Sequence, residues 1–203
     1  MDFYKTYLMP FFIGLLPVLM NCLYLLLKEH RAKGSRLRFL VAHVATCLES
    51  YSLDSLHTYH EWHNYICTHG LKGIASDNVP CVLQNFPKDV DWTVLQSGLL
   101  SKIVAFPNRI KISERSVQMA LEYHDENEQY QMHIAILTQL YHTGDEAWSL
   151  AQELRQVVST TSPHQEYLTK SWGYIRDTHD EKVEEMRQRG QKFSFRPDKV
   201  IGA

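Results

Sequence analysis

The sequence has few residues of the kinds that interrupt or staple a folded chain: 9 Gly, 7 Pro and 4 Cys among 203 residues. The scarcity of Gly and Pro excludes a collagen-like chain or a flexible linker. The cysteines contain no C-x-x-C pair, so neither a four-cysteine zinc site nor a disulfide framework is suggested. Reduced thiols are the simplest interpretation.

A strong excess of charge of one sign is also missing. The formal net charge is -2 and the isoelectric point is about 6.6, which removes the bulk electrostatic case for nucleic acid as a partner. Hydrophobic residues make up 44% of the chain and aromatic residues 11%. This supplies enough apolar surface for a packed core and excludes a disordered chain.

Catalytic signatures are absent as well. The sequence contains no G-x-x-x-x-G-K-[ST] phosphate loop, no G-x-G-x-x-G fingerprint, no G-x-S-x-G elbow and no H-E-x-x-H zinc motif. A di-iron centre would need two Glu-x-x-His motifs, and the nearest match is the single Asp54-x-x-His57. The sequence therefore favours a protein without enzymatic activity.

What the sequence does have is one long apolar run. No charged residue lies between Thr6 and Leu27, and the run is long enough to cross a bilayer as a helix. A signal peptide would have a shorter apolar region followed by a small-residue cleavage site, but Leu27 is followed directly by Lys28 and Glu29. We therefore predict an uncleaved single-pass signal anchor over residues 6–27, preceded by a short extracytoplasmic segment over residues 1–5.

A basic juxtamembrane segment over residues 28–38 sets the predicted orientation. It contains Lys28, Arg31, Lys33, Arg36 and Arg38. Since the side richer in Lys and Arg stays in the cytoplasm, we expect the N-terminus outside, a cytoplasmic C-terminal domain and a location in the plasma (inner) membrane. The basic cluster would also attract anionic headgroups, so the lipid bilayer is a predicted partner. Within the run, Pro17 should kink the helix, and Asn21 is a candidate intramembrane polar contact.

Residues 39–190 show helical periodicity. Thr143 and Glu146 have the spacing of a capping box, and Gly144 suits the end of the preceding helix. Ser162 suits the N-cap of the next helix, and Pro107 should end the helix predicted over 90–106. We expect helices over 36–50, 53–66, 90–106, 113–142, 145–158 and 163–189, with the continuity of 113–142 open, and a long loop over 69–86. The predicted fold class is all-α: a single N-terminal transmembrane helix, a bundle of about five or six helices over 39–190, and a C-terminal tail over 191–203.

The most suggestive chemical cluster lies on one predicted helix and consists of His57, His60, Glu61, His63 and Cys67. Residues three and four apart share a helix face, so neighbouring pairs can approach one ion. All four ligands cannot converge on a straight helix, because His57 and His63 point in different directions. One interpretation is a metal site at His57, His60, His63 and Cys67 for zinc, iron or haem, with Glu61 as a candidate proton carrier. The other is aromatic-rich packing with partly exposed imidazoles.

His179 allows two interpretations. The pair His179-Asp180 invites comparison with the all-helical metal phosphohydrolases of the HD type, but the flanking apolar run and glycine of such a pocket are missing. The residue also continues the apolar positions Leu168, Trp172 and Ile175, which indicates a hydrogen-bonded core histidine.

Taken together, these features predict a membrane-anchored helical interaction, scaffold or regulatory module without a catalytic motif or a cofactor. Its exposed face would bind an unidentified protein partner or a second copy of the chain. The alternative function is a metal- or haem-binding enzyme or sensor built on the His/Cys cluster.

Overall fold

A computed structural model describes residues 9–68, 79, 81–88, 90–122 and 129–194. Its elements are four long helices and a short 3-10 helix: α1 (Met9–Cys67), η2 (Trp92–Val94), α2 (Ser97–Glu122), α3 (Gln129–Val157) and α4 (Gln165–Ser194). The described residues contain no strand. The all-α prediction is confirmed, but the bundle has four long helices rather than five or six.

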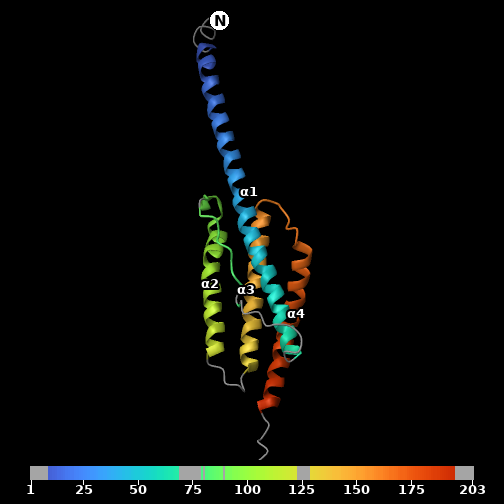
Figure 1. Cartoon of the computed structure of the whole chain (residues 1–203). Coiled ribbons are helices and arrows are strands. Elements are labelled where there is room, and N and C mark those ends of the chain that lie inside the picture. The colour runs from blue at the N-terminus through green and yellow to red at the C-terminus, as the bar shows by residue number, and fades with distance from the viewer. Residues whose placement is uncertain (1–8, 69–78, 80, 89, 123–128, 195–203) are drawn as a thin grey trace, which may run out of the picture.

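Helix α3 lies at the centre of the bundle and contacts α1, α2 and α4 (Figure 1). The core residues of α1 run from Leu40 to Ile66, and they pack against α3 residues from Ile134 to Leu154. The largest fully buried side chain is Trp172 of α4. Burial of these apolar faces is what holds the helices together.

Helix α1 is continuous where the sequence predicted two helices, over 36–50 and 53–66. Ser52 and Ser55 lie near the expected break and are fully buried. The Ser52 hydroxyl accepts a hydrogen bond from Trp172 Nε1 at 2.7 Å and donates one to the Gly144 carbonyl at 3.0 Å. Serine has a low helix propensity because its hydroxyl can bond to the local backbone. Here the small serine side chains allow the neighbouring helices to approach closely, and α1 continues through them.

Gly144 and Pro107 also lie inside helices that the sequence ended at these positions. Gly144 is within α3, where a Cβ would come within 2.5 Å of the Trp172 ring, so its small size serves packing rather than a turn. Pro107 is within α2. A proline in a helix removes a backbone hydrogen bond and costs about 3 kcal/mol; burial of the neighbouring Ile103, Phe106 and Ile110 offsets that cost.

The remaining boundaries agree in part with expectation. The predicted helix 113–142 is divided, because α2 ends at Glu122 and α3 begins at Gln129; residues 123–128 lie outside the described residues. The predicted helix 163–189 corresponds to α4, but α4 begins at Gln165 and continues to Ser194, into the predicted tail. The Ser162 hydroxyl accepts a hydrogen bond from the His164 N–H at 3.1 Å just before the helix begins. Of the predicted loop and tail, residues 69–78, 80 and 195–203 lie outside the described residues.

The predicted membrane anchor is contradicted. Among the helices as the structure describes them, none combines the length and the apolarity needed to cross a bilayer. A spanning helix needs about 20 predominantly apolar residues, and in α1 the charged residues Lys28 and Glu29 follow Leu27 directly. Residues 1–8 and the side chains of residues 9–15 lie outside the described residues. The prediction of a single-pass protein of the inner membrane, with its N-terminus outside, is therefore wrong by this finding.

Candidate functional site

The N-terminal part of α1 projects beyond the other helices (Figure 1). Its large apolar side chains are 50–65% exposed, and they occur at nearly every position: Leu16, Val18, Leu19, Met20, Leu23, Tyr24, Leu25, Leu26 and Leu27. We call residues 16–27 the apolar rod. A helix that is apolar on all sides is normally buried in a larger structure, and an exposed apolar surface of this kind marks an interaction site.

A basic collar follows the apolar rod along the same helix. Its members are Lys28, Arg31, Lys33, Arg36 and Arg38, and all are exposed. The Lys33 ammonium forms an ion pair with Glu29 at 3.0 Å, but both side chains are more than half exposed and the pair contributes little stability. Asn21, the candidate polar contact, is exposed on the rod.

A recess lies where α1 joins the bundle. Ser35, Arg36 and Phe39 of α1 face Val90 and Asp91 of the segment before η2 across a cavity of about 480 Å³. Phe39 is 63% exposed. The Asp91 carboxylate accepts hydrogen bonds from the Thr93 N–H and hydroxyl, which lower its pKa. The rod, the collar and this recess follow one another along α1 and are apolar and charged in turn.

The predicted metal site is not assembled. His57, His60 and Cys67 are exposed, and His57 Nδ1 lies 3.5 Å from Glu61 Oε1 in a solvent-facing pair. Cys67 Sγ lies 3.7 Å from His63 Nε2, so the helix brings together one pair of candidate ligands. No group of three His, Cys, Asp or Glu side chains in the described part of the chain is arranged to hold a metal ion.

His179 is a core histidine, as its position in the apolar seam indicated. It is 4% exposed, its Nδ1 lies 3.3 Å from the Tyr59 hydroxyl, and its Nε2 lies 3.5 Å from the Thr138 hydroxyl. Burial is the main cause that lowers the pKa of His179. No sequence pattern indicated Tyr59 and Thr138 as its partners, because they lie on two other helices.

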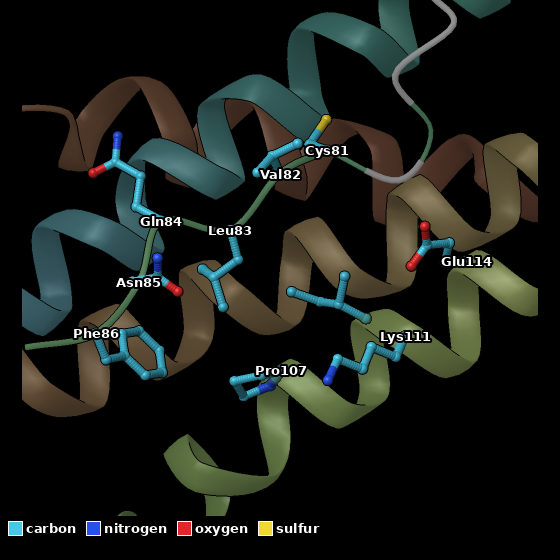
Figure 2. Close-up of a pocket in the computed structure, with 10 residues that line it drawn as sticks. Cys81, Val82, Leu83, Gln84, Asn85, Phe86, Pro107, Lys111 and Glu114 are labelled. Atoms are coloured by element: carbon cyan, nitrogen blue, oxygen red, sulfur yellow. The ribbon is translucent and has the colours of Figure 1, made fainter. Parts of the chain in front are cut away.

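A groove runs between α2 and the extended segment over residues 81–86 (Figure 2). Leu83 and Phe86 of the segment and Pro107 of α2 line its apolar part, while Lys111 and Glu114 stand on its α2 side. Its volume is about 410 Å³. The buried Cys81 thiol at one end lies 3.5 Å from the Thr58 hydroxyl, and burial raises the pKa of this thiol, so it is not a nucleophile poised for reaction.

Comparison of the chain with protein-family models, with curated proteins and with solved structures finds no match in any of the three. Function must therefore be argued from the residues of this chain.

Proposed function

We propose that this protein is a helical interaction module without a catalytic role, in which the bundle supports α1 and the apolar rod packs against helices of a protein partner. The observation that carries the proposal is the exposure of the rod: its large apolar side chains are 50–65% accessible along its length. Water contact at so many apolar side chains is unfavourable, and burial against another helix removes it.

The magnitudes favour a specific contact. Burying four leucine-sized side chains contributes about 6 to 12 kcal/mol, while association costs roughly 4 to 15 kcal/mol. The rod offers nine large apolar side chains, so a partner that covers most of them would offset the cost of association. The basic collar favours a partner with acidic residues beside its apolar surface. Two collars placed side by side would repel, which disfavours a parallel pair of copies.

The alternative function, a metal- or haem-dependent enzyme or sensor, has less support. The described residues offer the single ligand pair His63 and Cys67, whereas a zinc site uses at least three protein ligands. The interaction module is therefore the proposal that we carry forward.

A photo-crosslinking amino acid at Leu23, introduced into the full chain in its native cells, tests the proposal. We expect one recurrent protein to be crosslinked, and the crosslink to be lost in the double variant Leu19→Glu, Leu26→Glu. The matched control is Val104→Glu, Ile112→Glu, which alters side chains of similar exposure on α2, 61% and 64%, and should leave the crosslink intact.

Two results would overturn the proposal of a protein partner. One is crosslinking to no protein, or equally to many. The other is transfer of the crosslink to lipid, together with burial of the rod in phosphatidylcholine vesicles.

A further inference from the structure

His179 connects three helices through one imidazole ring. It lies on α4, its Nδ1 reaches the Tyr59 hydroxyl of α1, and its Nε2 reaches the Thr138 hydroxyl of α3. The Tyr141 ring of α3 packs against it, with ring centroids 4.5 Å apart. Contacts from all three helices therefore converge on a single titratable group.

His179 also marks a boundary within α4. Before it, Leu168, Trp172 and Ile175 are fully buried, and Arg176 pairs with Asp145 of α3 at 2.7 Å. After it, Met186 is the one residue in the buried class among residues 180–188. The N-terminal half of α4 is thus anchored by fully buried apolar side chains, whereas among residues 180–188 only Met186 and the partly buried Val183 pack against the core.

The charged and titratable groups around His179 come from all three helices. Helix α1 contributes the Tyr59 phenol and two histidines beside it. The centroid of the Tyr59 ring lies 6.4 Å from that of the stacked His63 ring and 6.0 Å from that of His60. Helix α3 contributes the Tyr141 phenol and His142, whose ring lies 6.5 Å from His179. Helix α4 itself contributes Asp180 and Lys182, while its Glu185 acts on His63.

These surroundings oppose a positive charge on the ring. Burial has the largest effect, and His142 and Lys182 add repulsion; Asp180 acts in the opposite direction, and the net effect lowers the pKa of His179. Burial and repulsion from Lys182 also lower the pKa of His63, whereas Glu185 acts to raise it. The hydroxyl oxygens of Tyr59 and Thr138 can accept hydrogen bonds from both N–H groups of a protonated His179, so protonation does not cost these hydrogen bonds. The protonated ring is disfavoured because it is desolvated and lies near groups of like charge.

We propose that His179 is a pH-sensitive latch, which in its neutral form holds the C-terminal half of α4 against α1 and α3 and on protonation releases it. The released segment would uncover the face of α1 around Tyr59. The latch is independent of the apolar rod, which lies at the far end of α1.

The direction of the pH dependence follows from linkage. In the released state His179 is solvated and takes up a proton near its ordinary pKa of about 6.5, while the docked ring requires a lower pH because its pKa is lowered. Between these two values the released state binds more protons, so acidification favours release. The docked segment is stable above about pH 6.5 and loses stability below it. The ratio of released to docked molecules changes at most about tenfold per pH unit.

Hydrogen–deuterium exchange of the full chain tests the latch, with labelling times corrected for the intrinsic exchange rate. Between about pH 7.5 and pH 5.5, we expect exchange in residues 180–188 to rise by at most about tenfold, while residues 165–175 keep their protection. The variant His179→Gln retains hydrogen bonding without a titratable ring and should lose this pH response. The control His57→Gln, whose native side chain is 75% exposed, should keep it.

A second variant keeps the latch falsifiable if His179→Gln does not fold. Lys182→Gln removes repulsion from the protonated, docked His179 and so narrows the gap between its pKa in the docked and in the released state. The rise in exchange of residues 180–188 on acidification should therefore be about two- to threefold smaller than in the native chain. Equal protection of residues 180–188 at both pH values in the native chain would overturn the proposal. So would a pH response that survives in a folded His179→Gln protein, or a Lys182→Gln protein whose pH response is as large as that of the native chain or larger.

Discussion

Replacing Gly144 by alanine tests how closely α1, α3 and α4 approach. Gly144 lies inside α3, and a Cβ built there would meet the Trp172 ring carbons Cζ2 and Cη2 at 2.5 Å and the Ser55 Cβ at 2.8 Å. Trp172 and Ser55 are fully buried. The indole ring is also held by its hydrogen bond to Ser52 at 2.7 Å, so it cannot move aside without breaking a contact.

Two effects of opposite sign decide the outcome. Alanine is a better helix former than glycine, which favours the variant by about 1 kcal/mol. The added methyl group overpacks a rigid site, which costs about 1 to 3 kcal/mol and more where the neighbours are rings or backbone. Since all three contacts are shorter than 3.0 Å, a distance that real Cβ atoms essentially never show, we expect the upper end of that range and a net destabilisation of about 2 kcal/mol.

Urea unfolding followed by far-UV circular dichroism measures the difference, and Gly173→Ala is the matched control. Gly173 lies next to Trp172 in α4, yet a Cβ there meets nothing within 4 Å; this variant should be neutral or more stable by up to about 1 kcal/mol. A Gly144→Ala protein as stable as the native chain would refute the close packing of the three helices.

Three further predictions concern single side chains. Glu49→Gln should lower the free energy of unfolding by about 3 kcal/mol in urea titration, because Arg155 then loses its nearly buried carboxylate partner at 2.9 Å; an unchanged midpoint would contradict this pairing. Ser52→Ala should cost about 1 to 2 kcal/mol, seen as an earlier thermal transition, because it leaves the Trp172 N–H unpaired. Brief thiol labelling with mass spectrometry should modify the exposed Cys22 and Cys67 but spare Cys47 and Cys81, since burial hides these two thiols and raises their pKa; early labelling of either would argue against the core.

The helical nature of the chain could be predicted from periodicity, but the helix boundaries could not. The seam Leu168, Trp172 and Ile175 correctly indicated a buried face of α4, and Ser162 correctly indicated its start. Gly144 misled because a small residue has two physical uses, and the same two uses apply to Ser52, which lies between the helices expected over 36–50 and 53–66. Their small size permits a turn in isolation, and it equally permits a tryptophan from another helix to pack against them. Only the tertiary contact decides between these uses.

In the candidate sites, too, the local spacing could be predicted, but the contacts with other helices could not. Helical spacing placed His63 beside Cys67, and this pair is present. Helical spacing alone could not predict a third metal ligand, because such a ligand would have to come from another helix or loop. For His179 the spacing indicated burial, and burial is found. Its partners Tyr59 and Thr138 lie far away in the sequence, so the connection among three helices became evident only from the fold.

The continuity of α1 links the stability of the bundle to the proposed contact surface. An isolated helix as short as the apolar rod is marginal in water, because the first turn is costly to form. In this protein the buried half of α1, from Leu40 onward, forms that first turn within the core, and the projecting half only extends an existing helix. The rod is therefore held as a helix in one direction before any partner arrives. A partner then does not have to order the rod, so more of the free energy from burying its apolar side chains appears as affinity.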